Sequence, residues 1–133
     1  MENRWIYYGV FLPREERAYL LEKFKNHIPK GWKVYCDHMT VIYNDKSENA
    51  QAWAEKCEKY IGHKANLSVT HIGISDKALA LRVSGFKTNN AIPHITIATS
   101  PIGKPVDSNY ITNWVPLSET ILLTAVLDKV CPR

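Results

Sequence analysis

The sequence predicts an α+β fold in which two mainly antiparallel sheets, related by pseudo-twofold symmetry, flank a central cleft with helices outside. Segments with strand and helix character follow one another in the order β-α-β-β-α-β-β-β-(α)-β. Two of the strand segments, residues 37–43 and 93–99, contain His-x-Thr followed by an apolar, β-branched run. The Gly-rich loop that marks a dinucleotide-binding fold is missing from the sequence. Two similar halves, each giving one His-x-Thr strand to the cleft, account for these features.

Length and composition indicate an ordinary globular protein. A chain of 133 residues fits one domain, residues 1–133, and can bury a hydrophobic core. No apolar run approaches the roughly 18 residues of a membrane span, and the N-terminus lacks a signal-peptide pattern. The three cysteines lack metal-ligand spacing, so we expect reduced thiols and a cytoplasmic location. The net charge of +4 suits an anionic substrate, although basic surfaces of this size are common.

The chain opens with a strand and a helix. Residues 5–12 are aromatic and β-branched, which predicts a buried strand. Pro13 suits the first turn of a helix with apolar residues at helical spacing, and the Pro-Lys-Gly run at 29–31 ends that helix. Residues 32–35 lead as an extended segment into the first His-x-Thr strand, 37–43.

A second helix has the clearest apolar face in the chain, over residues 50–61. Asp45 and Ser47 are both candidate N-caps for it. Cys57 falls inside the apolar stripe, so we expect it to be a packing residue and not a nucleophile.

The second half of the chain consists mainly of strands. Residues 66–74 and 78–83 predict a hairpin, and a change of parity near 70–73 predicts either a bulge or a strand end in its first arm. A polar loop, 85–92, leads to the strand 93–99, and 107–114 is expected to form a short helix. Residues 120–130 predict a long strand in a central or well-covered position.

The two His-x-Thr segments predict a catalytic site. In a strand, residues two apart lie on the same face, so His38 is beside Thr40 and His94 is beside Thr96. Two imidazoles flanking one substrate atom can act as general base and general acid near neutral pH. The two hydroxyls can donate hydrogen bonds to non-bridging phosphate oxygens. The alternative interpretation is that these are two unrelated strand histidines.

Nothing in the pattern calls for a metal or another cofactor. No carboxylate cluster accompanies the histidines, and strand alternation predicts that Asp37 lies on the face opposite His38. The four side chains therefore predict phosphodiester cleavage without a metal ion.

These motifs resemble the paired H-x-T/S motifs of the two-histidine (2H) phosphoesterase superfamily. The segment Pro93–Thr99 is especially similar to the cyclic phosphodiesterase domain of fungal-type tRNA ligases. The resemblance implies a bilobal fold, metal-independent chemistry, and RNA 2′,3′-cyclic phosphates, 2′–5′ linkages or small nucleotide signals as substrates. It implies that His38 and His94 are the acid–base pair and that Thr40 and Thr96 bind phosphate.

We therefore predict a phosphodiesterase that cleaves 2′,3′-cyclic phosphate or 2′–5′ bonds of RNA ends or small nucleotides, with no obligate protein partner. Two alternatives stay open: hydrolysis of cyclic dinucleotide or oligoadenylate immune signals, and a non-catalytic nucleotide- or RNA-binding module. Further candidates are the aromatic residues for base stacking, Tyr7 and Tyr43 and also Tyr8 and Phe86, and the cations Arg82, Lys87 and Lys104 for phosphate steering. For each of these, a core or surface role is the competing interpretation.

Overall fold

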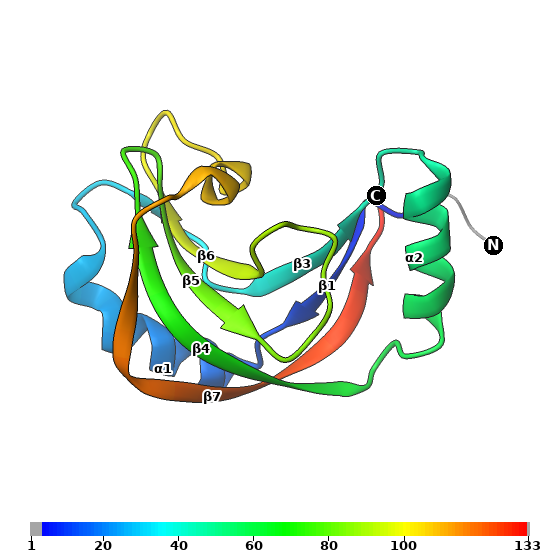
Figure 1. Ribbon diagram of the computed structural model, residues 1–133, viewed down its shortest axis with the longest axis horizontal. Helices are drawn as coiled ribbons and strands as arrows, with labels where there is room; N and C mark the ends of the chain where they lie inside the picture. The colour runs from blue at the N-terminus through cyan, green and yellow to red at the C-terminus, as the bar shows by residue number, and fades with distance from the viewer. Residues whose placement is uncertain (1–3, 133) are drawn as a thin grey trace.

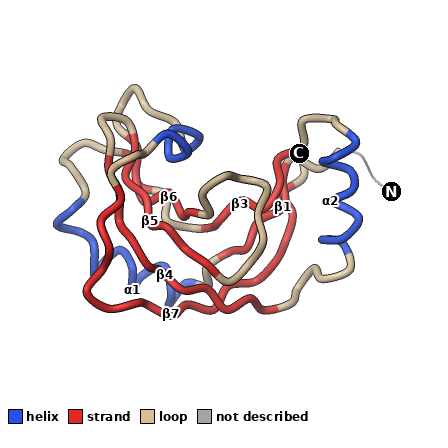
Figure 2. The backbone as a smooth tube through the Cα atoms, viewed as in Figure 1, coloured by secondary structure: helices blue, strands red, loops and turns tan. Residues whose placement is uncertain are grey.

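The computed structural model describes residues 4–132 and contains the predicted series of elements in the predicted order (Figures 1 and 2). A short 3₁₀ segment follows the first helix, and a second 3₁₀ segment takes the place of the third helix. The strands are β1 (Tyr7–Phe11), β2 (Lys33–Val34), β3 (His38–Tyr43), β4 (Lys64–Ile74), β5 (Ala78–Ser84), β6 (His94–Thr99) and β7 (Trp114–Val130). The helices are α1 (Arg14–Phe24), η1 (Lys25–His27), α2 (Glu48–Glu58) and η2 (Pro105–Tyr110).

All seven strands belong to one antiparallel sheet with the order β2-β6-β5-β4-β7-β1-β3. The α+β class and the antiparallel pairing are as predicted, but the prediction of two sheets is wrong. The reason is the length of the two central strands, because β4 and β7 pair from Lys64↔Val126 to Gly73↔Trp114 and so join the two halves. Pseudo-twofold symmetry stays a prediction.

The cleft results from the curvature of this sheet. In the strand order, β5 and β6 lie on one side of the central β4–β7 pair, and β1 and β3 lie on the other. The sheet bends so strongly that β3 and β6 lie next to each other (Figure 1). The corner between β2 and β3 ties them together, since the Tyr35 amide donates to the Ile97 carbonyl at 2.7 Å and the Cys36 amide donates to the Thr96 carbonyl at 2.9 Å.

Strand alternation separates the core from the cleft. On β3 and β6, Met39, Val41, Ile95 and Ile97 point into the hydrophobic core and are at most 1% exposed. The intervening histidines and threonines therefore point to the opposite face. One set of residues builds the core, and the alternate set is left for the site.

The two α-helices, α1 and α2, lie toward opposite ends of the curved sheet (Figure 1). Ser47 is the N-cap of α2, as predicted, and its hydroxyl accepts a hydrogen bond from the Ala50 amide at 3.0 Å. Cys57 is buried in the core, as predicted, and the cysteines at 36, 57 and 131 are free thiols. No helix formed by the described residues is both long and apolar enough to span a membrane.

Several boundaries differ from those predicted. The first helix stops at Phe24 and continues only as η1, and the short helix is a 3₁₀ segment, η2, that starts before residue 107. The last strand begins at Trp114, six residues earlier than predicted. The predicted bulge in β4, at Val69/His71, shifts the register so that pairing with β7 continues to Trp114.

Candidate active site

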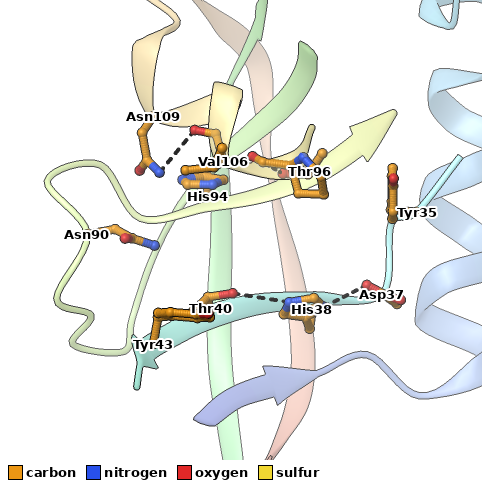
Figure 3. A pocket seen from close by; sticks show the side chains of 11 residues that line it. Tyr35, Asp37, His38, Thr40, Tyr43, Asn90, His94, Thr96, Val106 and Asn109 are labelled. Atoms are coloured by element: carbon orange, nitrogen blue, oxygen red, sulfur yellow. Dashed lines mark hydrogen bonds and ion pairs between the residues drawn. The ribbon is translucent and has the colours of Figure 1, made fainter. Parts of the chain in front are cut away.

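A cleft of about 340 Å³ lies where β3 and β6 approach each other, and both His-x-Thr pairs line it (Figure 3). The structure brings together all four side chains predicted as catalytic or phosphate-binding, although the two motifs lie 56 residues apart in the sequence. The lining residues are Tyr35, Asp37, His38, Thr40, Tyr43, Asn90, His94, Thr96, Pro105, Val106 and Asn109.

Both ring nitrogens of His38 have partners. Nδ1 lies 2.7 Å from Oδ1 of Asp37, and Nε2 lies 3.1 Å from Oγ1 of Thr40. Because the ionised carboxylate can only accept, the Nδ1 atom of His38 carries a hydrogen. The hydrogen bond to His38 lowers the pKa of Asp37 below its ordinary value. His38 and Asp37 therefore form an ion pair whenever the imidazole is protonated.

The placement of Asp37 corrects a prediction. Alternation along a regular strand would direct it away from His38, but β3 starts only at His38. Cys36, just before Asp37, adopts a positive φ of 54°, so the backbone is not extended there. The carboxylate can therefore reach the imidazole of the next residue.

The ring of His38 rests on β1. It stacks on Tyr7 and on Phe11, with ring centroids 4.9 and 5.1 Å away. Between these two residues, Gly9 leaves room for the ring, since a Cβ atom on Gly9 would lie 3.3 Å from Cδ2 of His38. Tyr7 thus packs on His38 and does not line the cleft, whereas Tyr43, 62% exposed, does line it.

His94 lies in a different environment from His38. Its Nδ1 atom donates to the carbonyl oxygen of Ile92 at 2.7 Å, so Nε2 is the nitrogen without a hydrogen in the neutral ring. The residue is only 7% exposed. Burial lowers the pKa of His94, helped by the nearby His38 and opposed by the hydrogen bond to Ile92. The neutral form, with a lone pair on Nε2, is therefore favoured.

Thr96 has a partner that the sequence does not reveal. Its hydroxyl lies 2.8 Å from the hydroxyl of Ser108, which is fully buried, and donates weakly to the Pro105 carbonyl at 3.4 Å. If Ser108 donates to Thr96, only the weak bond to the Pro105 carbonyl competes with a phosphate oxygen for the hydrogen of Thr96.

Several lining residues come from parts of the chain without a recognisable motif. Tyr35 lies between β2 and β3, Asn90 lies in the loop before β6, and Val106 and Asn109 belong to η2. Among the predicted cations, Arg82 is the register partner of His94 on β5 and Lys104 precedes η2, but neither lines the cleft. Within residues 4–132, no three His, Cys, Asp or Glu side chains gather as metal ligands would.

The cleft thus combines one neutral imidazole, one imidazole paired with a carboxylate, and two hydroxyl donors. Proton transfer in both directions at neutral pH, next to hydrogen bonds for an anion, is the chemistry that this set of groups allows.

Comparison with known proteins agrees with this chemistry. A family model described as the fungal tRNA ligase phosphodiesterase domain matches residues 22–121, which include both motifs. No curated protein matches the sequence significantly. Among solved structures, the crystal structure of a fungal RNA kinase has a similar fold, with a TM-score of 0.67 at 13% identity. The match covers 98% of this chain and 46% of the kinase chain, so this chain spans about half the length of that protein.

The family match covers most of the chain and contains the residues that line the cleft from β3 to β6. The chain belongs to the family of fungal tRNA ligase phosphodiesterase domains, which are phosphodiesterases of the two-histidine type.

Proposed function

We propose that this chain, as a single domain over residues 1–133, is a metal-independent phosphodiesterase that opens 2′,3′-cyclic phosphates at RNA ends or on nucleotides, or cleaves 2′–5′ bonds. The observation that carries this proposal is the convergence of His38, Thr40, His94 and Thr96 on one cleft. The family description supports a phosphodiester substrate of RNA.

His94 acts as the general base in this proposal. Because burial favours its neutral form, Nε2 accepts a proton from the attacking water, whose oxygen forms a bond to phosphorus. The phosphorus bond to the 2′ or 3′ oxygen breaks, and the product is a monophosphate on the other oxygen.

His38 acts as the general acid. The Asp37 carboxylate accepts a hydrogen bond from Nδ1 at 2.7 Å and so leaves Nε2–H of the protonated ring to protonate the leaving oxygen. The hydroxyl of Thr40, 3.1 Å from Nε2, lies where it can bind a non-bridging phosphate oxygen next to the transferred proton. Thr96 does the same on the opposite side of the cleft.

Tyr43 is the proposed base-stacking residue, because its exposed ring lies at the cleft. Tyr7 is not proposed for this role, since its ring already packs on His38.

A product assay in the presence of EDTA tests the proposal. The panel contains nucleoside 2′,3′-cyclic phosphates, 2′–5′ oligoadenylate and cyclic dinucleotides. We expect turnover of the cyclic phosphates, and we expect His38→Ala and His94→Ala each to abolish it while the thermal melt stays cooperative. Turnover of the signalling nucleotides alone would instead favour an immune-signal hydrolase. RNA binding without any turnover would favour a binding module, and loss of activity in EDTA would contradict metal independence.

A further inference from the structure

A second cavity, of about 430 Å³, lies between α2, the start of β4 and the first residues of the loop that joins β5 to β6. It is separate from the catalytic cleft and shares no lining residue with it. Its floor contains the core residues Val41 and Leu127, and its rim is basic and aromatic.

Three lysines from three elements line this cavity: Lys56 on α2, Lys64 at the start of β4 and Lys87 in the loop. All three are exposed, and none forms an ion pair with a carboxylate of the described chain. Positive charge without intramolecular compensation favours an anionic ligand.

Three aromatic rings accompany the lysines. Trp53 and Phe86 are half-buried and pack against the core, while Tyr60 is 53% exposed and contacts His63 edge-to-face at 5.5 Å between centroids. Lysines interleaved with partly exposed aromatic rings are the combination by which proteins bind single-stranded nucleic acid, through phosphate contacts and base stacking.

The loop between β5 and β6 is the wall between the two cavities. Residues Gly85 to Lys87 line the second cavity, and Asn90 lines the catalytic cleft. The loop is fixed on β3, since Thr88 Oγ1 donates to the Thr40 carbonyl at 2.7 Å and the Asn89 amide donates to the Val41 carbonyl at 2.8 Å. Lys87 and Asn90 are three residues apart, so their Cα atoms are at most about 11 Å apart. A nucleic acid strand of a few nucleotides can span that distance.

The loop between β5 and β6 begins with a glycine whose backbone conformation and close contact with β4 would not suit another residue. Gly85 has a φ of +113°, and a Cβ atom there would lie 2.2 Å from the Asn66 carbonyl oxygen. The β5–β6 connection can therefore pass close to β4 and place Phe86 and Lys87 at the second cavity.

We propose that this lysine–aromatic cavity binds the single-stranded RNA that precedes the terminal phosphate, so that the natural substrate is an RNA strand and not a mononucleotide. This inference rests on the proposed function for the identity of the reacting end. The cleft would hold the terminal nucleotide, and the second cavity would hold nucleotides on its 5′ side.

The test compares binding and turnover in Lys56→Gln/Lys64→Gln/Lys87→Gln with a control, Lys23→Gln/Lys30→Gln/Lys77→Gln, which removes the same charge from exposed positions elsewhere. Fluorescence anisotropy measures the Kd of an eight-nucleotide single-stranded RNA with a 3′-phosphate over a range of salt concentrations. We expect the first variant to bind at least tenfold more weakly and the salt slope to fall by about 0.7 for each phosphate that a lysine no longer neutralises. The control variant should keep most of the wild-type affinity for this RNA, and its Kd should increase less than that of the first variant.

Turnover separates this cavity from the cleft. For the same RNA ending in a 2′,3′-cyclic phosphate, kcat/KM should fall in parallel with binding, while kcat/KM for a nucleoside 2′,3′-cyclic phosphate stays within twofold of wild type. Tyr60→Ala, at an exposed position, should weaken RNA binding by about 5- to 150-fold if the ring stacks on a base.

The outcomes distinguish this inference from the proposed function. If wild type turns over no substrate but RNA binding depends on the three lysines, the proposed function fails, and with it the claim about the substrate, while the assignment of the second cavity as an RNA-binding site stands. If wild type cleaves both substrates and the two triple variants bind RNA equally, the inference is wrong. An equal loss of mononucleotide turnover in the first variant would also overturn it, because the lysines would then serve the cleft.

Discussion

The two histidines differ in what their Nδ1 atoms contact, and His94 is in addition buried. The burial of His94 predicts the pH dependence of the activity. Burial holds the pKa of His94 below its ordinary value of 6.5. We therefore expect the ascending limb of kcat/KM against pH to lie below pH 6.5, because the free enzyme needs a neutral His94. NMR titration of the His94 ring should give the same pKa as this limb. A limb at or above pH 6.5 would contradict the role of His94 as base.

The same pKa shift affects stability in a defined direction. The unfolded chain binds a proton at His94 near pH 6.5, whereas the folded chain binds it only at lower pH. Between these two pKa values the unfolded state holds more protons, so the contribution of His94 to the free energy of unfolding decreases as the pH falls. Above pH 6.5 that contribution is fully present.

Asp37 is a positioning residue in this scheme, since it acts through His38. Asp37→Asn keeps the size of the side chain but allows its amide to donate to Nδ1, which would stabilise the wrong tautomer of the imidazole. We expect kcat to fall by about 10²-fold, less than the roughly 10⁴-fold effect of a fully buried catalytic-triad carboxylate. The difference follows from the exposure of the Asp37 side chain, which is 53% accessible.

The matched control is Asp76→Asn, at an exposed turn between β4 and β5. The informative measurement is the pH at which kcat falls on the basic side of its pH profile. Substitution of a residue with a merely structural role would not shift this pH. If Asp37→Asn retains wild-type kcat and its pH profile, the hydrogen bond to His38 has no catalytic role.

Residue-level prediction from the sequence succeeded where the position of a side chain depends on its neighbours along one strand. The i, i+2 rule placed each histidine beside its threonine on one face of β3 and of β6. It failed for Asp37 because the positive φ of Cys36 interrupts the alternation there. The positions of Ser108 and Asn109 near the cleft could not be predicted. They depend on the packing of η2 against β6, and no local sequence pattern indicates this packing.

At the scale of the element, β1 is the support for the first histidine. Its residues Tyr7, Gly9 and Phe11 share one face, and the ring of His38 lies over the gap that Gly9 leaves between the two aromatic rings. This support is a property of the strand pair, because it needs the antiparallel register Gly9↔Thr40 and Phe11↔His38.

Gly9→Ala tests the support. The new Cβ would lie 3.0 Å from the Met39 carbonyl oxygen and 3.3 Å from His38 Cδ2, so the ring must move by a few tenths of an ångström. We expect kcat to fall about tenfold, within the up to 10²-fold effect of an ångström-scale misplacement, while the protein stays folded. Steady-state kinetics and a thermal melt of the same sample are the measurements. Unchanged kcat in a folded variant would show that the position of the ring is not limiting.

The strands and helices could be predicted in type and order because each segment shows the hydrophobic periodicity of its own secondary structure. Their ends depended on tertiary pairing, as β7 illustrates. Residues 114–119 show no strand pattern of their own, but the bulge in β4 brings Val115 and Pro116 opposite Ile72 and His71. The start of β7 is therefore determined by pairing with residues about 45 positions earlier in the sequence, and local strand propensity does not predict it.

For the molecule as a whole, the single curved sheet explains how two distant motifs form one site. The strands β3 and β6 belong to opposite arms of the sheet, and the central β4–β7 pair connects those arms. A phosphate held by Thr40 on one arm and Thr96 on the other would bridge them directly. Product binding should therefore stabilise the folded state as a whole.

Differential scanning fluorimetry in EDTA with adenosine 2′- or 3′-monophosphate measures this effect. At 100 times its Kd, a ligand that binds only the folded state adds about 2.7 kcal/mol to the free energy of unfolding. For a domain of this size that corresponds to a rise in Tm on the order of 10 °C. Thr40→Val/Thr96→Val should lose most of this rise relative to its own ligand-free melt, and Thr70→Val, on β4 outside the cleft, should keep it. If the double variant shows the full rise, the phosphate does not bridge the two arms, and the two hydroxyls are not its ligands.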